Sequence, residues 1–146
     1  MDDRPPLDPE RELVWMRAAY EEALLAREEG EVPVGAVVVL DNRIIGRGHN
    51  RTEALQDPTA HAEMLAVTAA ANTLGSWRVE GASLYVTLEP CLMCSGAIFL
   101  ARIERLVYAT PDPKRGAVGS VIACSVAATT APRRSRIPPP MPRCSR

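Results

Sequence analysis

The sequence predicts a single α/β domain, and three features of it carry the prediction. An amphipathic helical pattern covers residues 9–30, and a β-branched run follows it. Further along, a strand, a helix and a second strand fit within residues 84–109, which implies two parallel strands joined by a helical crossover. With 146 residues, 47% of them hydrophobic, the chain can form one domain with its own core.

The first helix has clear start and stop signals. Asp8 suits an N-cap, Pro9 suits the first turn, and Gly30 suits the end. Its sheet-facing side is predicted from residues that repeat every three or four positions: Leu13, Met16, Tyr20, Ala23, Leu24 and Arg27.

A β-hairpin is predicted next, with strands over residues 34–40 and 44–48 separated by Asp41-Asn42-Arg43. A polar loop over residues 49–60 then leads to a second helix, which begins near His61 and ends at Gly75. The apolar face of this helix is predicted to be Met64, Leu65, Thr68, Ala71 and Leu74.

The last predicted elements are a strand over residues 84–88, a helix over 91–101 and a strand over 105–109. The helices that begin at His61 and at Cys91 should both start where a strand has just ended. In α/β sheets, functional groups collect at this edge.

Two short motifs supply the ligands of a metal site. His61 offers one imidazole, and Cys91 and Cys94 offer two thiols; together they can close three corners of a zinc tetrahedron. Cys91 and Cys94 lie three residues apart on one helix face, and Pro90 suits the first helical position. Because three ligands leave a fourth position open to water, the pattern predicts a catalytic zinc site with Glu63 placed to move protons.

Each of these residues has a structural alternative. Cys-x-x-Cys at a helix start is also the signature of a redox dithiol, but Pro90 and the upstream His-x-Glu favour zinc. Glu63 alone could be a solvated helix residue, and His61 alone a capping or core histidine. His49 is not predicted to be a ligand. Cys124 is predicted to be a small apolar filler and Cys144 an exposed thiol.

The order His-x-Glu and then Pro-Cys-x-x-Cys resembles the signature of zinc-dependent nucleobase deaminases. The stretches 32–37, 57–63 and 85–91 are similar to the bacterial tRNA-specific adenosine deaminases, and the resemblance covers residues 15–120. It implies one zinc ion per chain, a homodimer, and the three-layer α/β/α fold of cytidine deaminase-like proteins with a mixed central sheet.

The resemblance also implies a reaction. In this family, adenosine at the wobble position of a tRNA anticodon is deaminated to inosine by zinc-activated water, with the residue at the position of Glu63 as proton shuttle. Asn50, the backbone at Ala62, and Asp112 match positions that contact the nucleotide. Both residues also have a structural alternative: Asn50 as a turn-forming asparagine, and Asp112 as part of a turn between Pro111 and Pro113.

Two other functions share parts of this pattern. Deaminases of a free base or nucleoside, such as guanine or cytidine, have the same metal signature. A non-catalytic, zinc-stabilised RNA-binding protein is the alternative from another class, but such a site has no use for Glu63.

The termini differ from the central part of the chain. We expect a flexible N-terminus over residues 1–8, a deaminase domain over 9–120, and a divergent tail rich in proline and arginine over 121–146. The last strand and helix of the family are expected to be lacking or altered there. Residues after Thr130 carry five arginines and no acidic residue, which suits either a nucleic-acid-binding arm or a solvated tail.

The sequence favours a soluble, cytoplasmic protein without a membrane partner. No run of eighteen apolar residues occurs, and the first residues do not resemble a signal peptide. Four cysteines, two of them at metal-ligand spacing, fit a reducing compartment.

Overall fold

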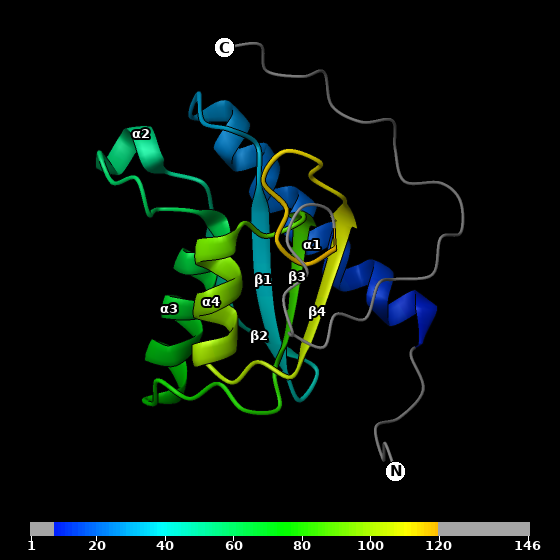
Figure 1. Cartoon of the computed structure of the whole chain (residues 1–146). Helices are drawn as coiled ribbons and strands as arrows, with labels where there is room; N and C mark the ends of the chain where they lie inside the picture. Colours follow the sequence, from blue (N-terminus) through cyan, green and yellow to red (C-terminus); the bar gives the residue numbers. More distant parts are fainter. Residues whose placement is uncertain (1–7, 120–146) are drawn as a thin grey trace.

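A computed structural model describes residues 8–119 of the chain. The expectations for residues 1–7 and for the tail after residue 120 therefore lie outside the described residues. In chain order the elements are α1 (Pro9–Glu28), β1 (Gly35–Leu40), β2 (Arg43–His49), α2 (Thr52–Leu55), α3 (Ala62–Leu74), β3 (Ser83–Leu88), α4 (Leu92–Leu100) and β4 (Arg105–Thr110) (Figure 1).

The four strands form a mixed sheet in the order β2-β1-β3-β4. β1 is antiparallel to both of its neighbours, whereas β3 and β4 are parallel, as the strand–helix–strand pattern predicted. Helix α1 covers one face of the sheet, and α3 and α4 cover the other (Figure 1). The predicted three-layer α/β/α fold is confirmed.

The hairpin between β1 and β2 turns on two residues with positive φ. Asp41 has φ 50° and Asn42 has φ 60°, as a two-residue turn of type I′ requires. Aspartate and asparagine tolerate this backbone region better than other residues with a side chain. The sequence therefore fixes the register of β1 against β2 locally.

Helix α1 begins as predicted, because Oδ1 of Asp8 accepts a hydrogen bond from the Glu10 N–H at 3.1 Å. The face predicted to meet the sheet was right only in part: Ala23 is buried and Met16 packs against the core, but Leu13, Tyr20 and Arg27 are exposed. The buried residues of α1 are Ala18, Ala19, Glu22, Ala23 and Ala26.

The reason lies in β1. A Cβ atom on Gly35 would lie 2.0 Å from the carbonyl oxygen of Ala19 and 2.3 Å from the nitrogen of Ala23. The helix backbone therefore rests directly on the strand, and this close approach leaves room only for alanine-sized side chains beneath it.

Helix α3 repeats this arrangement on the other face. Its buried residues are Ala62, Glu63, Ala66 and Ala70. The predicted face was largely wrong here: Thr68 and Leu74 are exposed and Met64 and Leu65 are only partly buried, although Ala71 packs against the core. Gly46 and Gly48 of β2 explain the shift, because Cβ atoms there would lie 2.3 and 2.4 Å from helix carbonyl oxygens.

Two smaller expectations need correction. Pro90 is not in the first helical position, because α4 begins at Leu92 and Cys91 is its N-cap. The loop predicted over residues 49–60 contains a short helix, α2. Within residues 8–119, no helix is both long and apolar enough to cross a membrane.

Candidate metal centre

The metal-ligating side chains come from the starts of two helices. His61 is the N-cap of α3, Cys91 is the N-cap of α4, and Cys94 lies in the first turn of α4. α3 follows β2 and α4 follows β3, and these two strands run in the same direction because both are antiparallel to β1. Both helix starts therefore lie at one edge of the sheet, the upper end in Figure 1.

The donor atoms already have the spacing of a zinc site. Nδ1 of His61 lies 3.6 Å from Sγ of Cys91 and 3.5 Å from Sγ of Cys94, and all three donor atoms lie within 4.8 Å of one another. A tetrahedron built on ordinary zinc–nitrogen and zinc–sulfur bonds has a nitrogen–sulfur edge of about 3.6 Å. The three side chains thus fit zinc in both chemistry and geometry.

The protonation of the three ligands is coupled. Interaction with the Cys94 thiol, and then with His61, lowers the pKa of Cys91 to about 3. The same interaction raises the pKa of Cys94, and burial raises it further. The hydrogen bond to Cys91 also raises the pKa of His61. These shifts favour a Cys91 thiolate between two proton donors, and a bound divalent cation would take the place of their protons.

Glu63 is a buried carboxyl group beside these ligands. Its side chain is 5% exposed, and its Oε2 atom lies 3.6 Å from Sγ of Cys94, which donates to it. Burial raises its pKa to about 7, because the ionised form loses hydration inside the protein. A carboxyl group with a pKa near neutrality can both accept and donate a proton at physiological pH.

The other three predicted site residues lie around the same end of the sheet. Asn50 follows β2 directly, is 6% exposed, and donates its backbone N–H to the carbonyl of Val34 at 3.1 Å. Ala62 is buried in the first turn of α3, where N–H groups have no acceptor within the helix.

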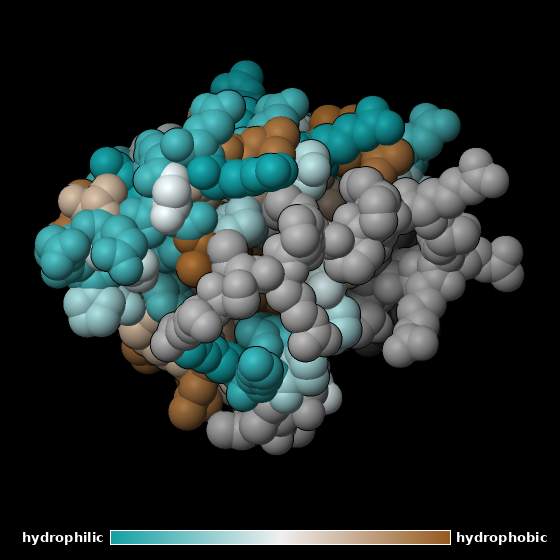
Figure 2. Space-filling model, turned by 90° about the horizontal axis from the view of Figure 1, so that it is seen from above, coloured by the Kyte–Doolittle hydropathy of each residue, from teal (hydrophilic) through white to brown (hydrophobic). Residues whose placement is uncertain are grey.

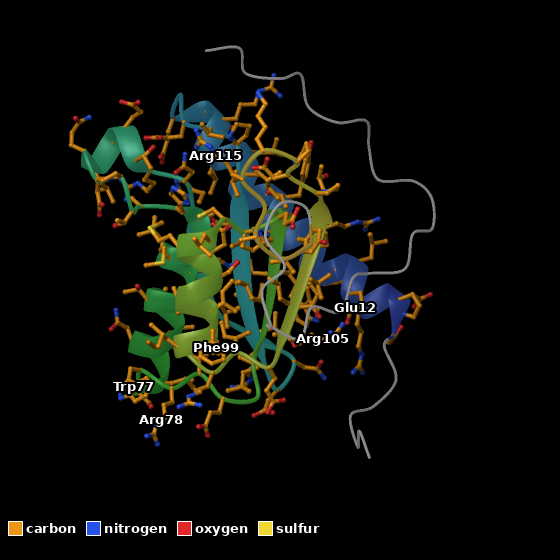
Figure 3. All side chains as sticks on the ribbon, in the orientation of Figure 1. Glu12, Trp77, Arg78, Phe99, Arg105 and Arg115 are labelled. Atoms are coloured by element: carbon orange, nitrogen blue, oxygen red, sulfur yellow. The ribbon has the colours of Figure 1, made fainter. Side chains whose placement is uncertain are left out.

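Asp112 is engaged within its own turn. Its Oδ1 atom accepts from the N–H groups of Lys114 at 3.0 Å and Arg115 at 3.2 Å. These contacts agree with the reading of Asp112 as a turn residue. Arg115 extends from this turn at the upper end of the molecule (Figure 3), and its charge acts against the raised pKa of His61.

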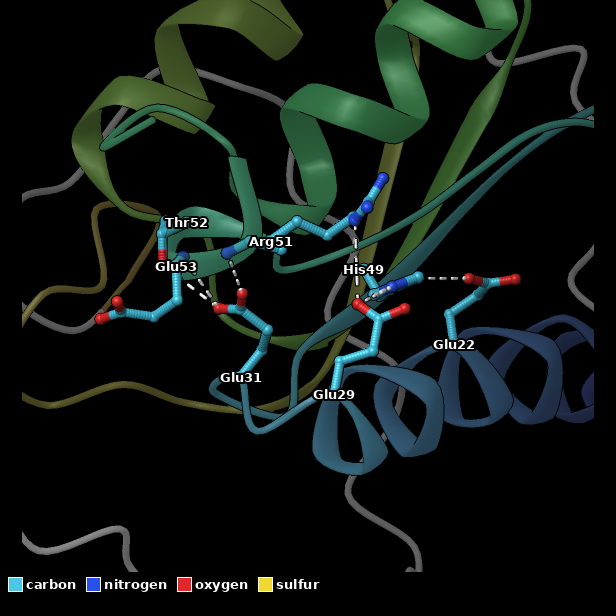
Figure 4. A network of polar contacts seen from close by, with 8 residues as sticks. Glu22, Glu29, Glu31, His49, Arg51, Thr52 and Glu53 are labelled. Atoms are coloured by element: carbon cyan, nitrogen blue, oxygen red, sulfur yellow. Dashed lines mark hydrogen bonds and ion pairs between the residues drawn. The ribbon is translucent and has the colours of Figure 1, made fainter. Parts of the chain in front are cut away.

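His49 lies apart from the ligand group, as predicted. Its Nδ1 atom is 3.1 Å from Oε2 of Glu22, and its Nε2 atom is 3.0 Å from Oε2 of Glu29 (Figure 4). Both ring nitrogens thus face carboxylates, one within α1 and one on its C-cap residue. The imidazole joins α1 to the end of β2, immediately before Asn50.

Glu31 is a supporting residue that sequence reasoning missed. It is 5% exposed and accepts hydrogen bonds from the N–H of Ala54 at 2.7 Å, the N–H of Glu53 at 3.2 Å and the hydroxyl of Thr52 at 3.5 Å (Figure 4). It therefore caps α2 from more than twenty residues away. Capping signals are sought within four residues of a helix start, so no local pattern marks it.

Figure 2 looks down on this end of the molecule. Hydrophilic side chains predominate in the coloured part of the surface, and hydrophobic ones form separate small patches. This surface suits a polar ligand better than an apolar one.

An α/β/α protein with this donor set and a buried glutamate beside it falls in the class of zinc-dependent deaminases. The family described as "Cytidine and deoxycytidylate deaminase zinc-binding region" matches residues 9–110. A tRNA-specific adenosine deaminase of Bacillus subtilis (strain 168) is 51% identical over 109 residues, which cover 75% of this chain and 68% of the relative.

Solved structures agree with this assignment. One, from a study of A-to-I editing by tRNA:A34 deaminases at the wobble position of transfer RNA, superposes with a TM-score of 0.78 at 48% identity, covering 82% of this chain and 98% of the other. A guanine deaminase from Bacillus subtilis superposes with a TM-score of 0.66 at 37% identity, covering 72% of this chain and 66% of the other. The chain belongs to the cytidine and deoxycytidylate deaminase family, and within it to the tRNA-specific adenosine deaminases.

Proposed function

We propose that this protein deaminates adenosine to inosine by hydrolysis at the wobble position of a tRNA anticodon. The observation that carries the proposal is Glu63, a buried carboxyl group with a pKa of about 7 beside three side chains that fit zinc. The identity of its relatives supports tRNA as the substrate.

In this proposal His61, Cys91 and Cys94 hold the zinc ion, and Glu63 is the catalytic residue. Zinc, when bound, supplies a Lewis acid that makes water nucleophilic near neutral pH. Glu63 takes a proton from the attacking water and delivers it to N1 of the adenine ring. It then carries a second proton to the departing amino group, so that one water is consumed and one ammonia is released.

Asn50 and Ala62 are proposed to orient the base. The Asn50 side chain offers both a donor and an acceptor at the end of β2, and the first turn of α3 offers backbone N–H groups. We propose that Asp112 lies near the ribose of the same nucleotide. The anticodon loop is single-stranded, so extruding its base costs less than extruding one from a duplex.

We further propose a homodimer that pairs through α4. Its sequence from Leu92 to Leu100 contains no charged residue, yet Leu92 is 58% exposed, Phe99 58% and Leu100 67%. A helix this apolar gains stability by burying its outer face against a second copy. Phe99→Ser should shift the molecular mass in light scattering from dimer to monomer. A wild-type protein that is monomeric at tens of micromolar contradicts the pairing.

The remaining proposals follow from the substrate. We propose a cytoplasmic location, which suits an enzyme that acts on tRNA. The deaminase domain is proposed to span residues 9–120, with no membrane partner.

The substrate is tested by measuring inosine in an anticodon stem-loop that carries a wobble adenosine, with free adenosine, guanine and cytidine assayed in parallel. We expect turnover of the stem-loop by the zinc-loaded protein and its loss in Glu63→Ala. Glu80→Gln, an exposed position, is the matched control and should act like wild type. Turnover of free bases alone would support a small-substrate deaminase instead.

Turnover of no substrate, by folded protein that carries zinc, would support the non-catalytic reading. In that case wild type and Glu63→Ala would behave alike in every assay.

A further inference from the structure

We propose that Glu89 is a positioning residue that sets the shape of the substrate-facing segment 111–119, hereafter the 111–119 loop. The kinetic part of this inference rests on the proposed function, whereas the structural part does not. Glu89 lies two residues before the metal-ligating Cys91 and is 2% exposed. It is buried close to the metal centre but is not one of the three grouped metal-ligating side chains.

The 111–119 loop wraps around this carboxylate. Oε2 of Glu89 accepts a hydrogen bond from the Asp112 N–H at 2.9 Å. Oε1 accepts from the Val118 N–H at 3.2 Å and from the Gly119 N–H at 2.7 Å. One side chain thus holds both ends of the loop, and charge-assisted bonds of this kind are stronger than bonds between neutral groups.

The middle of the loop also depends on Glu89. A Cβ atom on Gly116 would lie 2.2 Å from Oε2 of Glu89 and 2.6 Å from the carbonyl oxygen of Asp112. No residue with a side chain fits there unless the carboxylate moves. Gly116 in turn forms an antiparallel bridge with Cys91, and the Ala117 N–H donates to the carbonyl of Pro90 at 2.9 Å.

These contacts connect two parts of the site. The loop carries Asp112 and Arg115, and the charge of Arg115 reaches His61. Glu89 directly follows β3, and only Pro90 separates it from Cys91. Glu89 therefore fixes where the loop, and with it Asp112, lies relative to the metal ligands.

Glutamine cannot replace Glu89 without breaking a bond. Its side chain has one carbonyl oxygen and one NH2 group, whereas both carboxylate oxygens of Glu89 accept from backbone N–H groups. If the amide oxygen faces Val118 and Gly119, the NH2 group meets the N–H of Asp112, and two donors face each other. We expect this orientation, since it keeps two bonds and gives up one.

The test compares Glu89→Gln with wild type and with Glu104→Gln, an exposed control. For Glu89→Gln we expect zinc content to stay at one ion per chain. The KM for the anticodon stem-loop should rise ~10- to 100-fold, with a smaller change in kcat. Amide hydrogen exchange should quicken at Asp112 more than at Val118 and Gly119.

Two further variants separate the effect of the position of the carboxylate from the effect of its charge. Gly116→Ala keeps the carboxylate but pushes it away, and it should raise KM in the same way. Glu89→Asp retains the charge on a shorter side chain and should recover part of the loss. These variants carry the test if Glu89→Gln does not fold.

Unchanged KM together with unchanged exchange in the 111–119 loop overturns the inference. Loss of zinc and of folding in all three variants overturns it as well, since Glu89 would then be a purely structural residue. Failure of the proposed function looks different: wild type would not turn over the stem-loop, and the exchange pattern would still test Glu89.

Discussion

Glu63 combines two properties within one side chain, burial and a pKa near neutrality. Burial comes from its position on the inner face of α3, between Ala62 and Ala66, which rest on the glycines of β2. The raised pKa is a consequence of that burial. The packing that holds α3 on the sheet therefore also tunes the group proposed to move protons.

This coupling predicts that the metal-free protein loses folding stability as the pH rises. The pKa of Glu63 rises from 4.5 to about 7 on folding, so the folded state favours its protonated form. The stability it contributes is present below pH 4.5 and is lost as the pH rises through about 7. Glu63→Gln never ionises, so above pH 8 metal-free Glu63→Gln should be more stable than metal-free wild type, by up to about 3 kcal/mol.

Urea unfolding of the two metal-free proteins between pH 5 and 8.5 measures this difference. The gap between them should widen with pH, from less than about 1 kcal/mol at pH 5 to about 3 kcal/mol at pH 8.5. A gap that is constant over this range contradicts the assignment of a raised pKa to Glu63.

Zinc binding should be strongly pH-dependent for a related reason. Near pH 6 the metal-free site holds two protons, on His61 and Cys94, because the Cys91 thiolate raises both of their pKa values. Zinc must displace both protons, so its affinity should fall about hundredfold for each pH unit below that point. Competition with a chelating dye between pH 5 and 6 gives this slope. A tenfold or smaller change in zinc affinity per pH unit would show that at most one proton is displaced, so that the site is already partly deprotonated.

At the scale of elements, the helices are seated on the sheet by glycine and alanine rather than by large apolar residues. Gly48→Ala should therefore destabilise the protein, since its Cβ would lie 2.4 Å from the carbonyl oxygen of Ala62. We expect a loss of about 1–3 kcal/mol or more in the free energy of unfolding. Thr68→Ala, on the exposed side of α3, should change it by about 0.5 kcal/mol at most.

Denaturant melts of these two variants check the packing. Equal effects at both positions would contradict the assignment of the buried face of α3.

This packing also explains how far the sequence could predict the structure. The zinc ligands could be found because each lies at a helix start beside short-range signals, such as His-x-Glu and Pro-Cys-x-x-Cys. The buried faces of the helices could not be predicted fully in this way, because the periodicity of large residues also pointed to Leu13 and Leu74, which are exposed. What selects the true faces is a pairing between alanines and strand glycines from separate segments, and no single window contains both.

The same limit applies to Glu31 and Glu89. Each is an acidic residue whose hydrogen-bond partners lie more than twenty positions away. In the sequence Glu31 cannot be told from a solvated glutamate, whereas the place of Glu89 before Pro90 and Cys91 predicts structural support but not its partners. Only the fold brings the backbone donors to them.

At the scale of the molecule, the metal centre lies at one edge of a sheet with separate cores on its two faces. These cores consist of aliphatic, alanine and tyrosine side chains; His61 and Cys91 are only partly buried, and Cys94 alone of the three ligands is fully buried. Removing zinc with a chelator should therefore lower the melting temperature but leave the far-ultraviolet circular dichroism largely intact. Complete unfolding on chelation at 25 °C would show that the metal is needed for the fold itself.

The central claim is that Glu63 moves protons beside a bound zinc ion. The most direct test is the single-turnover rate of inosine formation in a wobble-adenosine stem-loop, with zinc content measured on the same samples. Glu63→Gln should keep one zinc ion per chain, and its single-turnover rate should fall ~10²- to 10⁴-fold. A Glu63→Gln protein that carries zinc and reacts as fast as wild type would contradict the account.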